Sequence, residues 1–348
     1  MKNILRVTLL LISTLGYGQK RLLAESDYPL WNTISSGPIS YDGNWLTYST
    51  HYKGADTLFI RNSRTARLIS LPSATHPQFS DDSRFVSYLS QDRVHLIGLQ
   101  SGKHSSYSAN GRHLFSSGGR YLILHDPAKG QLLLADLKYR KEALIGNVAE
   151  FVPDPTGRSA VLVFRNGGSD RMGMLTYSAN LPALPIAEGP SGSFRNITWN
   201  AKGNHLAFYE NDSTNTGEVA LVLWRTRGGN TAPRRLLSGS ANFPKNSRIA
   251  ATSLYVSDDG ERVFFDIASA QNDPDTAPSP SAVQIWKSNS SQLPGTTRKS
   301  AMKNKWSVWH PADGEIIVIE SDEHPHAVLT GDKKKCPPFQ LLRLSSQI

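Results

Sequence analysis

The chain has 348 residues, of which 39% are hydrophobic and 19% are charged. This balance is typical of a globular protein with a sizeable core and excludes an intrinsically disordered chain. The formal net charge is +9, but the Lys and Arg residues are spread along the sequence and form no basic stripe interleaved with aromatic residues. We therefore expect no nucleic-acid partner.

Residues 1–19 have the layout of a secretory signal peptide. Lys2 and Arg6 give a basic start, residues 7–15 form an apolar run, and small residues follow. The alternative interpretation is a buried first strand or helix. The run is too short for a stable membrane anchor, and no Cys follows it that could carry a lipid. The sequence therefore predicts a periplasmic or secreted protein.

A short motif then recurs along the chain. Each copy has an apolar or aromatic residue, a small polar residue, variable positions, a turn residue and an alternating strand pattern. Glycine accepts a positive φ, and Asp or Asn beside it stabilises a tight turn. The turn residues, which recur at intervals of 36 to 57 residues, are Gly43, Ser83, Gly119, Gly157, Gly203, Gly260 and Gly314.

The residues after each turn are strand formers, as in "WLTY" at 45–48 and "RVFF" at 262–265. A second apolar run follows most copies, for example "DTLFIRN" at 56–62 and "AVQIWKS" at 282–288. Each repeat is thus predicted to be an antiparallel sheet of three to four strands. A single sheet of this size cannot bury both faces, so the repeats predict an all-β fold, a β-propeller of about seven blades. The alternative is a β-sandwich with accidental similarity among its turns.

Three segments are predicted: a signal peptide at 1–19, the β-propeller at 20–332 and an irregular tail at 333–348. The Pro- and Ser-rich stretch at 269–282 is interpreted as a loop that protrudes from a blade. The tail carries the single cysteine, Cys336, so neither an intramolecular disulfide nor a Cys-based metal site can form. Burial of the core must therefore stabilise the fold.

Two pairs of acidic residues raise the question of a calcium site or of acid–base chemistry. Asp81 and Asp82 form one pair, and Asp258 and Asp259 form the other. Both pairs fall at the same place in the repeated motif, where Asp stabilises a turn. We therefore interpret them as structural residues.

Three histidines occur late in the chain, at His310, His324 and His326. With Glu323 they could be considered as zinc ligands, but their spacing matches no known zinc motif. They are interpreted as loop histidines. The sequence therefore predicts no catalytic, cofactor-binding or metal-binding residues, and no cofactor.

The repeated motif resembles the propeller repeats of TolB-type proteins. The stretches that carry this likeness are "ISYDGNWLTYSTHYKGADTLFIRNS" from Ile39 and "FSDDSRFVSYL" from Phe79. The motif is more similar still to the N-terminal propeller of secreted prolyl-oligopeptidase-family serine peptidases, in which a Trp-containing segment, here Trp31, precedes the first copy. Trp286 and Trp306 fit the later blades, so the resemblance covers nearly all of the chain after residue 19.

The resemblance implies a catalytic α/β-hydrolase domain that bears Ser, Asp and His in that order. The nucleophile of such a domain lies in a Gly-x-Ser-x-Gly motif, which occurs nowhere in the 348 residues. The nearest string, "GPSGS" at 189–193, lacks the final Gly. The family's catalytic residues therefore map to no position here, and the chain is expected not to be an enzyme.

Three hypotheses remain. The first is a truncated form of a peptidase, whose propeller would gate the entry of peptides. It is favoured by the tail, where "KKKCPP" at 333–338 replaces an expected strand. The second is a stand-alone, TolB-like periplasmic propeller that binds a protein. The third, an enzyme with its site on the propeller, finds no supporting constellation in the sequence. The expected partners are thus peptides or an envelope protein.

Overall fold

The computed structural model describes residues 24–31, 33–51, 56–108, 111–177, 183–211, 218–226, 232–269, 304–321, 327–331 and 333. These residues form six antiparallel sheets of four strands each, with two short 3-10 helices, η1 (Glu25–Leu30) and η2 (Ser117–Gly119), and no α-helix. In every sheet the strands are hydrogen-bonded in sequence order, so each sheet is a simple meander. The predicted all-β class and the predicted size of the sheets are confirmed.

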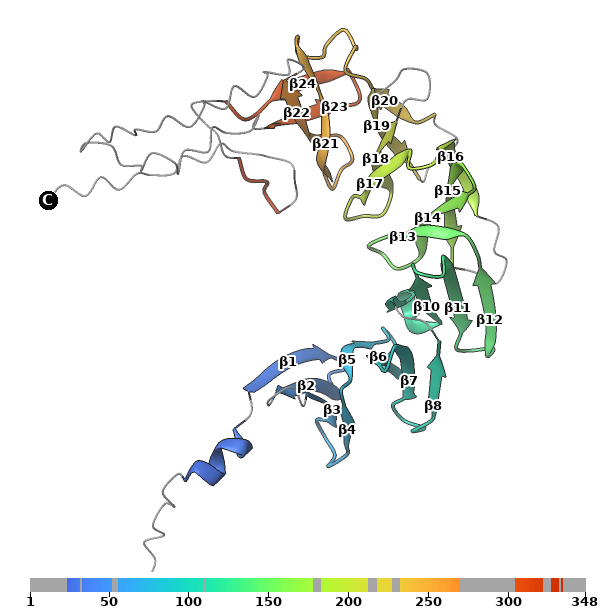
Figure 1. Cartoon of the computed structure of the whole chain (residues 1–348), viewed down its shortest axis with the longest axis vertical. Coiled ribbons are helices and arrows are strands. Elements are labelled where there is room, and N and C mark those ends of the chain that lie inside the picture. Colours follow the sequence, from blue (N-terminus) through green and yellow to red (C-terminus); the bar gives the residue numbers. More distant parts are fainter. Residues whose placement is uncertain are drawn as a thin grey trace, which may run out of the picture. The chain divides into compact units, whose positions relative to one another are not determined.

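The chain divides into two compact units, Met1–Ser108 and Ala109–Ile348. The first unit contains two sheets, drawn in blue and teal in Figure 1. Their strands are β1 (Thr33–Ile39), β2 (Trp45–His51), β3 (Thr57–Asn62), β4 (Leu68–Pro72), β5 (Thr75–Phe79), β6 (Phe85–Ser90), β7 (Arg93–Gly98) and β8 (His104–Tyr107).

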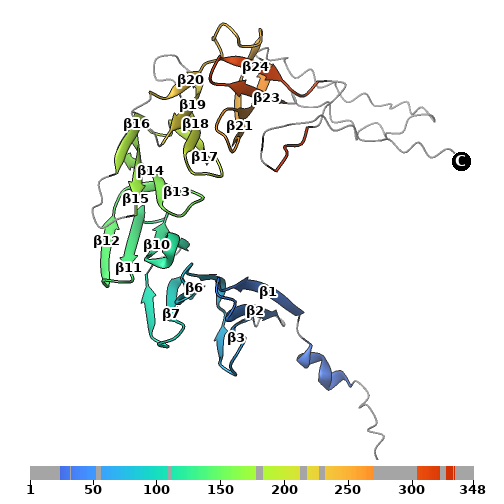
Figure 2. The same cartoon turned by 180° about the vertical axis from the view of Figure 1, so that it is seen from behind.

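The second unit contains the other four sheets, which follow one another from green to orange and red in Figure 1 and, seen from behind, in Figure 2. The third and fourth sheets comprise β9 (Arg112–Phe115), β10 (Tyr121–Asp126), β11 (Gln131–Asp136), β12 (Lys141–Ile145), β13 (Val148–Pro153), β14 (Ser159–Asn166), β15 (Ser169–Thr176) and β16 (Leu184–Pro190). The fifth and sixth comprise β17 (Phe194–Trp199), β18 (His205–Asn211), β19 (Val219–Arg225), β20 (Arg234–Leu236), β21 (Ser247–Val256), β22 (Val263–Ser269), β23 (Lys305–His310) and β24 (Glu315–Val318).

Inner strands of the second unit bury both of their faces, which explains their continuous apolar runs. In β14, Ala160 and Leu162 pack against the third sheet, whereas Val161 and Val163 pack against the fifth. Side chains alternate between the two faces of a strand, so each face of the fourth sheet meets a different neighbour. A separate apolar cluster joins the first and second sheets within the first unit.

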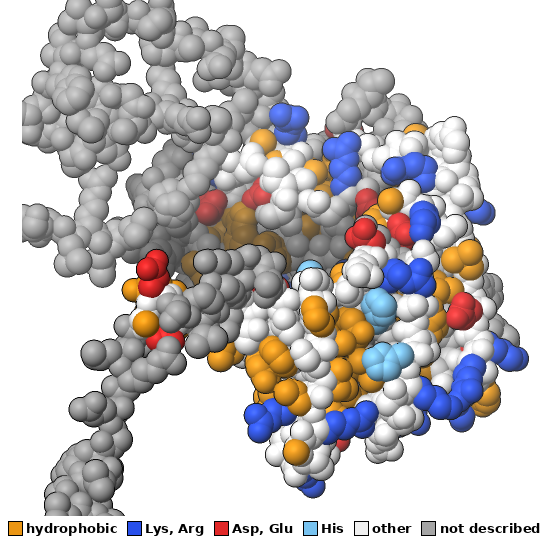
Figure 3. Space-filling model, turned by 60° about the horizontal axis from the view of Figure 1, so that its bottom comes forward, with side chains coloured by type: hydrophobic (Ala, Val, Ile, Leu, Met, Phe, Trp, Pro, Cys, Tyr) orange, Lys and Arg blue, Asp and Glu red, His pale blue; other side chains and the backbone are white. Residues whose placement is uncertain are grey.

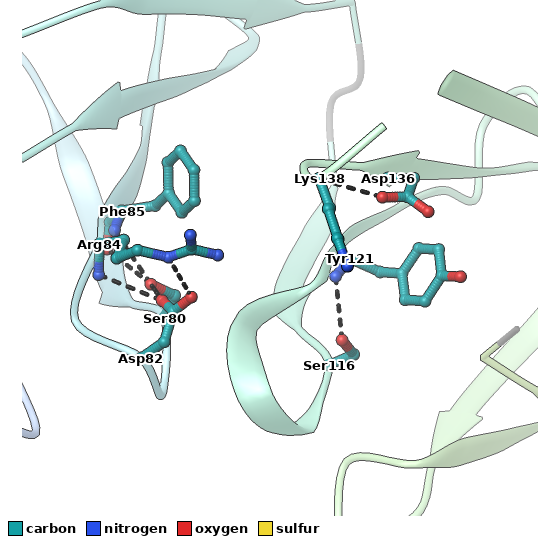
Figure 4. A network of polar contacts seen from close by, with 8 residues as sticks. All are labelled: Ser80, Asp82, Arg84, Phe85, Ser116, Tyr121, Asp136 and Lys138. Carbon is teal, nitrogen blue, oxygen red and sulfur yellow. Dashed lines mark hydrogen bonds and ion pairs between the residues drawn. The ribbon is translucent and has the colours of Figure 1, made fainter. Parts of the chain in front are cut away.

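All seven predicted turn residues adopt a positive φ, between 56° at Ser83 and 78° at Gly314. Figure 4 shows the turn before β6, in which the Ser80 N–H donates to the Phe85 carbonyl at 3.0 Å and the Phe85 N–H donates to Ser80 Oγ at 3.0 Å. Asp82 accepts hydrogen bonds from Ser80 Oγ at 2.7 Å and from Arg84 Nε at 2.6 Å. The acidic side chain at this position therefore binds its own turn.

The first six copies of the motif share this turn. A buried polar residue begins each of them, and its N–H donates to the carbonyl five residues later. The six residues are Ser40, Ser80, Ser116, Asp154, Asn200 and Ser257. The conserved geometry satisfies a buried polar group in each sheet and starts the second strand.

The seventh copy has a different place from the one that an in-phase repeat predicts. Its Gly314 lies between β23 and β24, the third and fourth strands of the sixth sheet, whereas the other copies join first and second strands. Its Gly314 N–H donates at 2.9 Å to a carbonyl four residues earlier, that of His310, whereas the Gly43 N–H of the first copy donates to a carbonyl three residues earlier, that of Ser40. The copy therefore does not begin a sheet of its own, and the described residues provide six of the predicted blades of about seven. The predicted strand at 282–288 and most of the predicted loop at 269–282 lie outside the described residues.

Candidate functional site

The described residues contain no group of three or more His, Cys, Asp or Glu side chains that could hold a metal ion. No helix among them is long and apolar enough to cross a membrane. Figure 3 shows one face of the molecule, on which Lys and Arg side chains surround patches of hydrophobic side chains. Two polar constellations within the described part of the chain merit comparison as sites.

The first constellation is a pocket between the fifth and sixth sheets. In the fifth sheet, His205 on β18 lies opposite Arg225 on β19, and Leu223 lies opposite Arg234 on β20. Residues directly opposite one another project from the same face of a sheet. Leu223 belongs to the apolar cluster that joins the fifth and sixth sheets, so all four side chains face the sixth sheet.

Two turns of the sixth sheet form the other wall. Gly260 and Glu261 come from the turn between β21 and β22. His310 ends β23, and residues 311–313 come from the turn between β23 and β24. The apolar contact between the sheets ends here and leaves a cavity of about 330 Å³. A Cβ atom added at Gly260 would lie 2.3 Å from His205 Cε1, so the absence of a side chain lets the imidazole approach the turn.

The charged side chains of the pocket differ in the contacts that they make with the rest of the protein. Arg234 Nη1 donates to the Pro311 carbonyl, which anchors this guanidinium across the two sheets. The Arg225 guanidinium forms no hydrogen bond or ion pair with another described residue. The carboxyl group of Glu261 is largely exposed and lies 4.0 Å from Arg262 Nη1, whereas Asp313 accepts a hydrogen bond from the Glu315 N–H at 3.0 Å.

His205 lies partly buried beside these guanidiniums, and its Nδ1 is 3.0 Å from Asn204 Oδ1. Burial, followed by the positive charge of Arg225, lowers the pKa of His205 below its ordinary value, while Asp259 acts in the opposite direction. The imidazole of His205 is therefore mainly neutral at pH 7, whereas Arg225 and Arg234 bring positive charge to the pocket.

The second constellation lies at one end of the first sheet. Ser35 Oγ on β1 is 2.5 Å from His51 Nε2 at the end of β2, and His51 Nδ1 is 3.1 Å from Asp56 Oδ1 just before β3. This is the order of contacts in a Ser-His-Asp catalytic triad. No pattern in the sequence pointed to this chain of contacts, because the three residues belong to three different strands or strand ends.

Cross-strand register explains the arrangement without catalysis. Thr33 pairs with His51, which puts Ser35 at the diagonal position, and Thr50 pairs with Thr57, which brings Asp56 beside His51. The side chains of His51 and Asp56 are 41% and 46% exposed. Triad chemistry depends on preorganised donors for the oxyanion in a site that excludes water. These exposed groups are better described as a polar clamp between strands.

The residues weighed from the sequence fall into different places. His310 is the last residue of β23 and is half-buried in the pocket wall, so its interpretation as a loop histidine was wrong. His324, His326 and Glu323 lie outside the described residues. Arg234 and Arg235 are adjacent in the sequence but lie on opposite faces of β20: Arg234 faces the pocket, and Arg235 Nη2 contacts Glu210 Oε2 at 2.7 Å. Sequence reasoning missed the pocket because its walls come from segments about one hundred residues apart.

Meander sheets of four strands that pack face to face through apolar clusters define the chain as a β-propeller protein. The chain is similar to Porphyromonas gingivalis dipeptidyl peptidase 4, with 11% identity and a TM-score of 0.51, and the match covers 85% of this chain and 47% of that protein. This chain therefore spans about half the length of that relative. The similarity concerns the fold.

Other similar structures include the β-propeller domain of the Trilobed protease from Pyrococcus furiosus, with 11% identity, a TM-score of 0.36, and coverage of 84% of this chain and 86% of that one. TolB from Acinetobacter baumannii has 16% identity and a TM-score of 0.33, and the match covers 81% of this chain and 64% of that one. No protein-family model matches the chain, and no curated protein matches it.

Proposed function

We propose that this chain is a non-catalytic, secreted β-propeller that binds peptides or an envelope protein. It resembles the substrate-gating propeller of prolyl-oligopeptidase-family serine peptidases. The support comes from the repeated motif, the propeller fold and the lack of a Gly-x-Ser-x-Gly motif in the sequence.

The pocket between the fifth and sixth sheets is the observation that carries the binding function. It combines a cavity, an apolar floor at Leu223 and Pro311, and the guanidiniums of Arg225 and Arg234. Small-ligand sites are typically concave, with an apolar lining and a few polar groups that fix the ligand's orientation. The described lining contains no Ser, Thr or Cys that could serve as a nucleophile. Such a site is suited to binding.

Catalysis can be tested directly on the purified chain. We expect no turnover of fluorogenic prolyl peptides and no labelling of Ser35 by a fluorophosphonate probe, because the Ser35–His51 pair is exposed to water. The matched variant is Ser35→Ala. Labelling of the original chain that the variant abolishes, or peptide turnover by both, would contradict the non-catalytic proposal.

Secretion rests on the pattern at residues 1–19 and has its own test. The gene expressed in a Gram-negative host should yield a periplasmic product whose N-terminus, measured by mass spectrometry, lies near Gln19. Lys2→Glu together with Arg6→Glu should retain the precursor in the cytoplasm. Retention of the full-length original chain in the cytoplasm would contradict the proposal.

A TolB-like role predicts a different partner. In a pull-down from an envelope extract, one stoichiometric protein would favour this alternative over the peptidase-like propeller. Binding of short peptides without such a protein would favour the peptidase-like interpretation.

A further inference from the structure

We propose that the pocket between the fifth and sixth sheets binds a carboxylate, and that its ligand is the free C-terminus of a short peptide. This inference rests on the proposed function, because it names the ligand chemistry of the same pocket. Four features carry it: the placement of two guanidiniums, the anchoring of one of them, the acidic groups opposite, and the size of the cavity.

The two guanidiniums project from neighbouring strands on one face. Arg234 lies opposite Leu223, and Arg225 is two residues further along β19, so the two arginines are diagonal neighbours. Diagonal positions are about 7–8 Å apart in a sheet, close enough for both long side chains to reach one oxyanion. Two cations at this separation repel each other, and an anion between them relieves the repulsion.

One of the guanidiniums is already held in place. Its bond to the Pro311 carbonyl uses one of the five donors of Arg234 and leaves the others for a ligand. The Arg225 guanidinium donates no hydrogen bond to another described side chain or carbonyl. The planar guanidinium group matches a carboxylate in a two-point contact, which is why arginine recognises carboxylates better than lysine does.

The opposite wall argues for a peptide carboxylate over a phosphate. Glu261 and Asp313 contribute negative charge to the pocket, and they repel a doubly charged phosphate more strongly than a singly charged carboxylate. They also offer acceptors for the backbone N–H groups that precede a C-terminal carboxylate. The free C-terminus of a peptide supplies both a carboxylate for the arginines and backbone N–H groups for the acidic side chains.

The cavity is small and partly apolar. Its volume of about 330 Å³ is at the lower end of the range for ligand sites, roughly 300–1,000 Å³. Leu223 and Pro311 supply apolar contacts for one side chain of the ligand. The pocket thus suits the last one or two residues of a chain, with the remainder of the peptide in solvent.

The test is isothermal titration calorimetry of the full chain with acetyl-Gly-Ala-Leu as the free acid and as the C-terminal amide. We expect the acid to bind roughly tenfold to hundredfold more tightly, the range of one to two charge-assisted hydrogen bonds. Arg225→Gln should remove most of that difference. Arg225→Lys should restore part of the difference, because lysine restores the positive charge but cannot make the two-point contact of a guanidinium.

Arg235→Gln is the matched control, since this residue follows Arg234 on β20 but bonds to Glu210 on the other face. It should leave the affinity for the acid unchanged. Equal affinity for acid and amide, or equal effects of the changes at 225 and 235, would overturn the inference and leave peptide binding intact. Binding of inorganic phosphate in place of the acid would overturn the choice of ligand. Absence of binding by both peptides would contradict the inference and peptide binding together.

Discussion

The pocket of the fifth and sixth sheets and the Ser35–His51–Asp56 chain of the first sheet are built in the same way. In both, cross-strand register brings polar side chains from consecutive strands onto one face. They differ in what covers them. A neighbouring sheet contributes a second wall to the pocket, whereas the His51 and Asp56 side chains stay about two-fifths exposed or more.

This difference shows that residue identity alone does not make a site. The first sheet presents the residue types of a well-known catalytic chain, but water solvates them and weakens each interaction. The pocket presents residues without a familiar motif, yet it places two cations beside a cavity with an apolar floor. Enclosure by the adjacent sheet therefore distinguishes a candidate site from a surface hydrogen-bond chain.

The largest expected effect is on the wall that encloses the pocket. Gly260→Ala should destabilise the protein by about 2–4 kcal/mol, because alanine at a φ of 77° is strained and its Cβ would meet the His205 ring. Urea-induced unfolding measures the change. Gly43→Ala is the control: its φ is 70°, but nothing lies within 4 Å of the added Cβ. Equal losses for the two variants would show that His205 does not pack on the turn.

A smaller effect is expected beneath the pocket. The buried Tyr209 hydroxyl donates to the Ser253 carbonyl at 2.6 Å across the interface of the fifth and sixth sheets. Tyr209→Phe leaves that carbonyl without its donor and should cost about 1–3 kcal/mol in the free energy of unfolding. Tyr177→Phe is the comparison, because the buried Tyr177 hydroxyl has no partner among the described residues. Its removal should be neutral or stabilising, and the opposite order of the two variants would contradict this account.

The pocket should also impose a pH dependence on stability. The pKa of His205 is lowered in the folded protein, chiefly by burial, so the unfolded chain binds the proton more readily. The stabilisation is therefore present above the ordinary histidine pKa and is lost as the pH falls below it. His205→Gln should reduce the loss of unfolding free energy between pH 7.5 and pH 5.5. An unchanged slope would show that His205 does not contribute.

The smallest effect is expected on the first sheet. His51→Ala removes exposed contacts to Ser35 and Asp56, and exposed ion pairs typically contribute at most about 1 kcal/mol. The midpoint of urea unfolding should therefore change little. A loss of unfolding free energy as large as that of Gly260→Ala would mean that the polar clamp contributes as much to stability as the pocket wall, which would contradict the comparison.

The fold could be predicted from the sequence because the turn motif depends on the local backbone conformation of a few consecutive residues. A positive φ occurs at every predicted turn residue, including Ser83, which is not glycine. The Ser83 side chain makes a contact that glycine could not make: its Oγ accepts a hydrogen bond at 3.0 Å from the Asp42 N–H in the turn of the preceding sheet. That contact is tertiary, so no local pattern could have predicted it.

The candidate sites were harder to predict from the sequence than the fold. The motif copy at Gly314 lies between the third and fourth strands of the sixth sheet, a position that its sequence did not distinguish from those of the other copies. His310, interpreted as a loop histidine, ends β23 and lines the pocket. Sequence periodicity predicts which residues share a face, but the pairing of faces from different sheets depends on packing over long separations.

The most direct test of the central claim follows the histidine rings by NMR in a chain with isotope-labelled imidazoles. Titration with acetyl-Gly-Ala-Leu free acid should move the resonances of His205 and His310 and leave those of His51 in place. Assignments come from His205→Gln, His310→Gln and His51→Gln. Shifts at His51 alone, or no shift at His205 and His310 when the peptide binds, would contradict the claim that the pocket between the fifth and sixth sheets is the binding site.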